Sequence, residues 1–164
     1  MSNFIPAILL VILLVGGTDL SVRLRAAAMS ELASKLKFRF TPGPAGLWGL
    51  WFPPKDGRPL PTTFPLRGDL LIGINRTWNV IEGEKDGINV LIFDSVRNLG
   101  MKSGTYSTII ATRGETDYFK DKSEHELIVH SNGWTILGRF RFWQILPWTL
   151  SIRRIEEHLN SFGT

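Results

Sequence analysis

Residues 78–94, WNVIEGEKDGINVLIFD, carry the strongest fold signal in the chain. Trp78–Glu82 and Ile88–Phe93 are rich in β-branched and aromatic residues, and the connection between them ends in Asp86-Gly87, a dipeptide typical of hairpin turns. In the second of these segments both alternating faces are largely apolar. A strand with two apolar faces is covered on both sides, so we expect it near the centre of an antiparallel sheet.

The surrounding segments predict more strands and a final helix. Tyr106–Thr112 has strand character, and Glu124–His130 and Trp134–Trp143 flank a second hairpin signal at Asn132-Gly133. Leu150–Phe162 shows the apolar spacing of an amphipathic helix. Residues 38–164 therefore predict an α+β domain, in which an antiparallel sheet of about five to six strands carries the C-terminal helix on one face.

The N-terminal segment predicts a membrane anchor. Residues 1–18 contain no charged side chain, and Phe4–Gly17 reads FIPAILLVILLVGG. As a helix, at ~1.5 Å per residue, residues 1–18 reach ~27 Å, close to the ~30 Å of a hydrocarbon core. We therefore expect a single transmembrane helix over residues 1–18, with the lipid bilayer as its partner. Arg23 and Arg25 follow this helix and nothing basic precedes it, so the positive-inside rule places the C-terminal domain in the cytoplasm.

A cleaved signal peptide is the alternative interpretation of this segment. Val15 and Gly17 fit the −3 and −1 positions of a cleavage site, which would release an exported protein near Gly17. A signal peptide normally begins with basic residues, and none precedes this apolar run. The anchor is the preferred interpretation, and the exported form stays open.

Residues 19–37 predict a juxtamembrane amphipathic helix. The segment contains no Gly or Pro and consists of good helix formers. One apolar stripe recurs every four residues, at Leu24, Ala28, Leu32 and Leu36. We expect this stripe to pack on the domain.

Residues 41–66 form a segment too rich in Pro, Gly and Trp for regular structure. Trp48, Trp51 and Phe52 lie within it and are candidate contact residues. They have three interpretations: they cap the sheet, they lie at the lipid interface, or they line a ligand groove. Capping is the default expectation, because a loop of this length must bury side chains to be ordered.

The composition narrows the range of functions. The chain of 164 residues has no cysteine, which excludes disulfides and thiolate metal sites. Its net charge of +4 is a small basic excess, concentrated just after the apolar segment, so the sequence does not favour a nucleic-acid partner.

Four segments between residues 31 and 142 carry a resemblance to a known family. They are ELASKLKFRF (31–40), NVIEGEKDGINVLIFD (79–94), STIIATR (107–113) and HSNGWTILGRFRF (130–142). Together they resemble bacterial membrane-anchored proteins of uncharacterised activity, whose domain carries a Gly … Val-x-x-Phe-Asp hairpin. The Asp of that pattern falls at Asp94, and the aromatic residue that often follows it is replaced by Ser95. The resemblance implies an anchored α+β domain and brings no known chemistry.

The chain shows no convincing catalytic, metal or cofactor motif, and we expect no cofactor. His125 and His130 are five residues apart in a β-rich segment, whereas a zinc-protease pair is four apart on a helix. His158 is expected to be an exposed residue of the last helix. Asp94 is the candidate buried carboxylate, because it follows an apolar strand; a salt bridge to Arg97 or bonds to backbone N–H groups is the simpler interpretation.

Three functional hypotheses follow. The preferred one is a non-enzymatic interaction module that contacts a membrane protein or a second copy of itself. The second is a domain that binds a small ligand or lipid under residues 43–64. The third is an enzyme in which Asp94 works with His125 or His130, and it requires these groups within hydrogen-bond reach.

Overall fold

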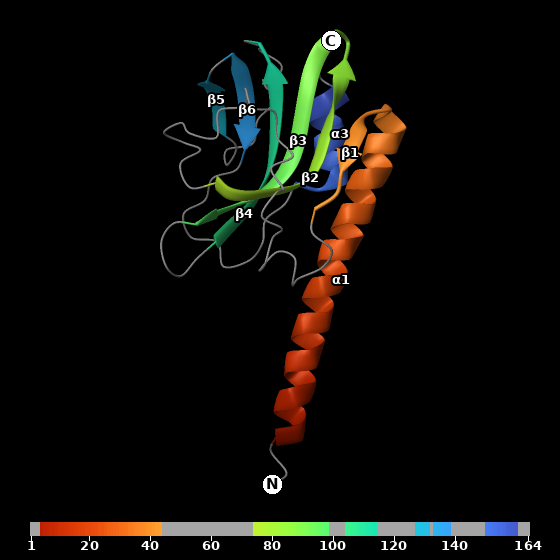
Figure 1. Cartoon of the computed structure of the whole chain (residues 1–164), viewed down its shortest axis with the longest axis vertical. Helices are drawn as coiled ribbons and strands as arrows, with labels where there is room; N and C mark the ends of the chain where they lie inside the picture. The colour runs from red at the N-terminus through yellow and green to blue at the C-terminus, as the bar shows by residue number, and fades with distance from the viewer. Residues whose placement is uncertain are drawn as a thin grey trace.

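A computed structural model describes residues 4–43, 74–98, 104–114, 127–131, 133–138 and 150–160 of the chain. The elements in chain order are helix α1 (Phe4–Leu36), strands β1 (Arg39–Thr41), β2 (Ile74–Lys85), β3 (Ile88–Asn98), β4 (Gly104–Arg113), β5 (Leu127–Ser131) and β6 (Trp134–Gly138), and helix α3 (Ile152–Asn160). The described strands form one six-stranded antiparallel sheet in the order β1-β2-β3-β4-β6-β5 (Figure 1). The predicted α+β class and antiparallel sheet are confirmed.

The β2–β3 hairpin turns at Asp86-Gly87, as the sequence predicts. Both residues have positive φ, 53° and 80°, and Lys85 pairs directly with Ile88. This is a two-residue loop in which both central residues are left-handed, the geometry that Asp-Gly favours. Because the loop needs only these two residues, β2 continues to Lys85; the predicted end of this strand at Glu82 was too early.

Strand β3 is internal to the sheet, with β2 on one side and β4 on the other. Its two faces belong to different apolar clusters: Val90 and Ile92 to one, Leu91 and Phe93 to the other. The prediction of a strand covered on both sides is confirmed. The strand runs on to Asn98, so Asp94 lies within it rather than just after it.

The second hairpin joins β5 and β6. Gly133 has a φ of 75°, and Ser131 pairs with Trp134 across a two-residue loop. Trp134 and Ile136 share one apolar cluster, as expected, and Leu137 belongs to the cluster on the opposite face. The described part of β6 ends at Gly138, so the predicted continuation to Trp143 lies outside the described residues.

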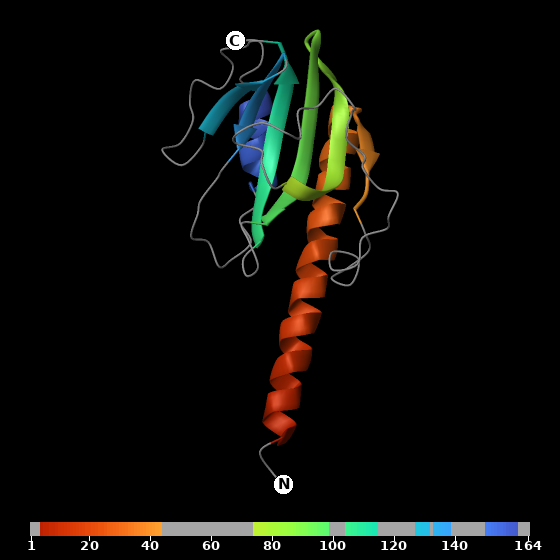
Figure 2. The ribbon, with the colours of Figure 1, turned by 60° about the vertical axis from the view of Figure 1, so that its left-hand side comes forward.

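The two helices cover one face of the sheet. In Figure 2 the C-terminal half of α1 and the whole of α3 lie on the same side of the strands. The apolar cluster between these layers joins residues of α1, α3 and the sheet; its buried members are Met29, Leu32, Ala33, Ile81, Val90, Ile92, Ile110, Leu137, Leu150, Ile155 and Leu159. The expected packing of the C-terminal helix on the sheet is confirmed.

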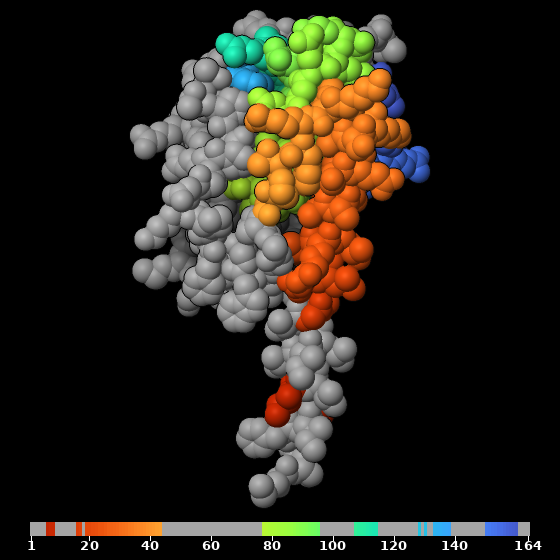
Figure 3. All heavy atoms as spheres, turned by 45° about the vertical axis from the view of Figure 1, so that its right-hand side comes forward, coloured from red at the N-terminus to blue at the C-terminus, as the bar shows by residue number. Residues whose placement is uncertain are grey.

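Helix α1 is continuous from Phe4 to Leu36 and is not interrupted at Gly16-Gly17. Its C-terminal half packs beside β1 (Figure 3), whereas its N-terminal half extends away from the sheet (Figures 1 and 2). The predicted apolar stripe is partly wrong, because Leu24 is 61% exposed. The prediction holds at Leu32, which is buried, and at Leu36, which packs against the same cluster. At the start of the stripe, Arg25 and Met29 face the sheet and Leu24 does not.

Within the described part of the chain, no helix has both the length and the apolar character that crossing a membrane requires. This finding does not support the transmembrane helix expected over residues 1–18, which stays a prediction.

The last turn of α1 ends in a Schellman arrangement. Lys37 has a positive φ of 58° and donates to the Ser34 carbonyl at 3.1 Å, and Phe38 donates to the Ala33 carbonyl at 2.8 Å. This geometry turns the chain into β1 and places Phe38 against the main apolar cluster. Opposite the Phe38 ring lies Gly83, where a Cβ would overlap the ring atoms.

Ser151, one of the two predicted caps, precedes the first residue of helix α3. The Ser151 hydroxyl accepts from the Arg154 N–H at 3.2 Å. Arg154 and Arg153 both bond to Glu157, and these contacts lower the pKa of that exposed carboxyl. The expectation that His158 is exposed is wrong: it is buried with Ile155 and Leu159, because these positions share the helix face that meets the sheet.

The contact between Gly83 and Phe38 gives a test of the packing between α1 and β2. We expect Gly83→Ala to lower the free energy of unfolding by about 1–3 kcal/mol, because the added methyl group overpacks the ring. Denaturant unfolding of the full-length chain in mild detergent measures the change. Gly16→Ala is the control, since a Cβ there meets nothing within 4 Å. Equal stability of Gly83→Ala and the parent chain would contradict the packing.

Candidate functional site

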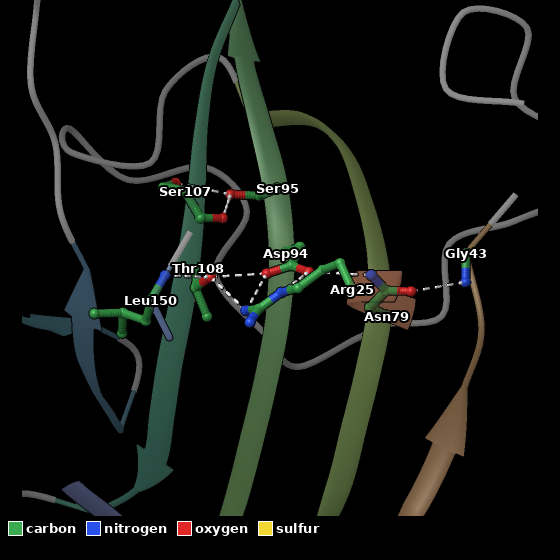
Figure 4. Close-up of polar contacts among 8 residues, drawn as sticks. All are labelled: Arg25, Gly43, Asn79, Asp94, Ser95, Ser107, Thr108 and Leu150. Carbon is green, nitrogen blue, oxygen red and sulfur yellow. Dashed lines mark hydrogen bonds and ion pairs between the residues drawn. The ribbon is translucent and has the colours of Figure 1, made fainter. Parts of the chain in front are cut away.

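Asp94 is fully buried in β3, directly opposite Thr108 of β4. Its carboxylate faces Arg25 of α1, which lies 69 residues earlier in the chain (Figure 4). Arg25 Nε donates to Oδ2 at 3.2 Å and Nη2 donates to Oδ1 at 3.0 Å. This two-pronged contact is the geometry in which a guanidinium binds a carboxylate most strongly.

Two neutral side chains complete the shell around the carboxylate. Asn79 of β2 donates from Nδ2 to Asp94 Oδ2 at 3.1 Å, and the Thr108 hydroxyl donates to Oδ1 at 2.8 Å. Each carboxylate oxygen therefore accepts two hydrogen bonds, which fills its acceptor sites. Asp94 has no acceptor position left for a substrate proton or a metal ion.

Thr108 extends the network to α3. Its hydroxyl oxygen accepts from Arg25 Nη2 and from the Leu150 N–H, both at 3.0 Å. Leu150 immediately precedes the Ser151 cap of α3, and its side chain lies in the same apolar cluster as Ile155. One polar network thus holds α1, three strands of the sheet and the residue that leads into α3.

Asn79 occupies an irregular position in β2. Its φ of 51° is left-handed, and the pairing of β2 with β3 shifts register between Trp78 and Ile81. A β-bulge redirects the side chain at such a position, and Asn is one of the few residues that adopt this conformation at low cost. The bulge points the amide at Asp94, and the Asn79 Oδ1 accepts from the Gly43 N–H at 3.4 Å.

The electrostatics of the site follow from its burial. The side chains of Arg25 and Asp94 are only 15% and 1% exposed. Moving either charge alone out of water is expensive, and an unpaired buried partner costs about 3–5 kcal/mol of stability. The pair is tolerated because each charge meets the other and the remaining acceptor sites are bonded. The arrangement is that of a structural junction rather than of a catalytic carboxylate.

The structure answers several expectations about candidate residues. Asp94 is buried, as predicted, and its described charged partner is Arg25; the side chain of Arg97, the partner that the sequence suggests, lies outside the described part of the chain. His130 is exposed and its Nδ1 lies 3.1 Å from the Thr135 hydroxyl. Thr135 pairs with Thr112, four residues along β4 from Thr108, the residue opposite Asp94, so the register keeps His130 and Asp94 apart. His125 lies outside the described residues, as do Trp48, Trp51 and Phe52.

Sequence reasoning missed three residues of the junction. The sequence presents Arg25 as a topology signal beside the apolar segment, and no local pattern distinguishes Asn79 or Thr108. Arg25 does lie four residues before Met29 and seven before Leu32, which places it on their helix face. Sequence spacing therefore places Arg25 and Asp94 each on a face that meets the core. It does not show that the two residues pair with each other.

Neither a metal centre nor a known relative assigns a chemistry to this site. The described residues contain no group of three or more His, Asp or Glu side chains that is placed to hold a metal ion. Comparison of the chain with models of protein families, with curated proteins and with solved structures gives no match.

The junction predicts strongly coupled effects of mutation. We expect Arg25→Met to lower the free energy of unfolding by about 3–5 kcal/mol, because it leaves Asp94 buried without its partner charge. Adding Asp94→Asn should restore part of this loss, since a neutral amide still bonds to its neighbours. Denaturant unfolding of the three full-length variants gives the coupling energy.

Arg23→Met is the matched control for this cycle. Arg23 lies on the same helix and forms an ion pair with Asp19, but its side chain is 68% exposed. An exposed pair of this kind contributes about 0–1 kcal/mol. Additive effects of Arg25→Met and Asp94→Asn would show that the two residues do not act as a unit.

Proposed function

We propose that the chain is a single-pass membrane protein that holds an α+β interaction domain at the cytoplasmic face of the cell membrane. The observation that carries the proposal is the exposure of large apolar side chains on α1 below the domain. Ile8 is 55% exposed and Leu20 is 57% exposed. Both lie on a helix that begins in the uncharged stretch of residues 1–18 and runs without a break into the domain.

Lipid is the environment that matches this half of the helix. Burying a Leu or Ile side chain gains roughly 1.5–3 kcal/mol compared with leaving it in water. A helix satisfies its backbone hydrogen bonds internally and is therefore suited to hydrocarbon. Among the described side chains, the core cluster takes its α1 members from the other half of the helix, between Met29 and Leu36.

The junction at Arg25 supports a tether of fixed geometry. Arg25 is bonded to Asp94 and Thr108, and Met29 and Leu32 are buried one and two turns further along the same helix. No loop separates the uncharged segment from these contacts, because α1 is one helix. A domain held in this way presents its surface to partners at the membrane in a constant orientation.

The hydrogen bonds of Asp94, the candidate carboxylate, favour an interaction role over a catalytic one. The acceptor sites of Asp94 are filled by Arg25, Asn79 and Thr108, which leaves it no part in proton transfer or metal binding. The proposed contact residues are Trp48, Trp51 and Phe52, because aromatic side chains are enriched in protein interfaces. The partner is a membrane protein or a second copy of this chain.

The orientation rests on the basic residues after the uncharged stretch. Arg23 and Arg25 favour a cytoplasmic domain during insertion, although in the folded protein both are paired, with Asp19 and Asp94. The alternative is an exported protein cleaved near Gly17. Such a product would keep Arg25 and its contacts, so the fold is compatible with both forms and the length of the mature chain distinguishes them.

The anchor predicts where the full-length chain is found. We expect it in the membrane fraction and resistant to alkaline carbonate extraction. Ile8→Arg combined with Leu13→Arg should release it, because each Arg costs about 2.5–3.5 kcal/mol at the centre of a membrane helix. Immunoblotting of the fractions measures the distribution.

Ser30→Arg is the matched control for the anchor experiment, since Ser30 is an exposed residue on the domain half of the same helix. This variant should fractionate like the parent chain. Intact, unprocessed parent chain in the soluble fraction would contradict the anchor. A reporter fused after Thr164 and active only outside the cytoplasm should stay inactive, and its activity would contradict the orientation.

The interaction role predicts contact through the aromatic residues. A photo-crosslinking amino acid placed at Trp48, Trp51 or Phe52 should give a discrete crosslinked band in intact membranes, either at twice the chain mass of 18.5 kDa or at the summed mass of the chain and one partner. The same amino acid at Glu84, an exposed hairpin residue, is the control and should give no such band. Absence of a discrete band at all three aromatic positions would contradict the role.

A further inference from the structure

Six residues, Asp19–Leu24, separate the uncharged stretch from the first residue that bonds to the sheet. Residues 1–18 have no ionisable side chain, and Arg25 is held by Asp94. As part of the continuous helix α1, this segment is ~9 Å long. The polar layer on each side of a bilayer is about 5–8 Å thick, given a ~30 Å hydrocarbon core within a ~40–45 Å membrane. The helical segment is therefore about as long as the polar layer is thick.

The chemistry of the segment also suits a headgroup layer. Arg23 Nε donates to Asp19 Oδ2 at 2.7 Å, so the two charges neutralise each other one turn apart. Leu20 lies between these two charged residues in the sequence and is 57% exposed, and Leu24 follows Arg23 and is 61% exposed. An ion pair mixed with exposed leucines fits the lipid interface, where apolar side chains enter the acyl boundary and charged groups stay hydrated.

We infer that Asp19–Leu24 lies in the lipid headgroup layer and that Leu20 and Leu24 contact lipid, so that the domain stands directly on the membrane surface with no linker. This inference rests on the proposed membrane anchor and adds how deeply helix α1 is inserted in the membrane. The occupant of the leucine face is lipid rather than a protein chain, because the face continues the same unbroken helix whose exposed Ile8 lies in the uncharged stretch.

The position of Arg25 fixes the upper limit of insertion. A free arginine at a membrane boundary extends toward the headgroups, but Arg25 is turned to the sheet by its bonds to Asp94 and Thr108. Sinking α1 further into the membrane would draw this buried network and the sheet with it. Withdrawing α1 by two turns would return Leu20 and Leu24 to water.

The absence of cysteine from the sequence makes a direct test clean. Single cysteines are introduced into the full-length chain as Leu20→Cys, Leu24→Cys and Ser30→Cys, all at exposed positions of α1. Membrane vesicles are chosen in which the Ser30→Cys domain faces the reagent, a charged maleimide that does not cross the bilayer. Labelling after denaturation in urea and detergent gives the total thiol of each variant.

The expected result is protection at the two leucine positions. Leu20→Cys and Leu24→Cys should label at least about tenfold more slowly than Ser30→Cys, which corresponds to roughly 1.4 kcal/mol in favour of the lipid-covered state. The domain itself does not cover these positions, so its folding alone would not protect them.

Other outcomes overturn the inference in distinguishable ways. Equal labelling of all three cysteines in a chain that resists carbonate extraction would place the membrane boundary before Asp19. That result would contradict this inference but not the proposed membrane anchor. Equal labelling in a chain that does not sediment with membranes would remove the anchor as well. A disulfide-linked dimer formed by Leu20→Cys or Leu24→Cys would show that a second copy, and not lipid, covers this face.

Discussion

The fold depends on one buried charge. Asp94 lies in an internal strand of the sheet, with no exposed surface, and a carboxylate at that position requires an opposite charge and filled acceptor sites. Arg25 supplies the charge from α1, and Asn79 and Thr108 supply the remaining bonds. Arg25, Asn79 and Thr108 all have to lie within hydrogen-bond distance of the same two oxygens, and this requirement fixes α1 and the bulge in β2 relative to each other. Thr108 also accepts from the Leu150 N–H, which fixes the start of α3 relative to them.

The apolar core and this polar network have different roles. The cluster formed by Met29, Leu32, Ile92, Ile110 and Ile155 stabilises the two-layer arrangement, but apolar contact is not directional and tolerates small shifts of a helix along a sheet. The ion pair is directional, since the guanidinium binds both carboxylate oxygens in one plane. Apolar burial therefore holds α1 against the sheet, and the pair sets the rotation and height at which it lies.

Helix α1 meets two different surroundings along its length. From Arg25 to Leu36 it faces the sheet and shares its core, whereas Ile8, Leu20 and Leu24 are exposed. The change falls at the ion pair, immediately after Leu24. A domain fixed at this point on a continuous helix has little freedom to swing about it, and this rigidity is what makes a membrane-tethered interaction module a coherent proposal.

Local sequence patterns specify the two hairpins and the internal strand but not every buried face, since Leu24 is exposed and His158 is buried. Asp86-Gly87 and Asn132-Gly133 specify two-residue turns because Asp, Asn and Gly adopt left-handed conformations at low cost, and the two apolar faces of residues 88–93 specify an internal strand. Which charges meet depends on how the helix packs on the sheet. Arg25 and Asp94 are 69 residues apart. Helical spacing places Arg25 on the face of Met29 and Leu32, but it does not identify Asp94 as the partner of Arg25 or select Asn79 as a bulge. Periodicity is a property of residues that are neighbours in the chain. A buried ion pair depends instead on how whole elements pack, so local sequence patterns do not reveal the pairing of Arg25 with Asp94.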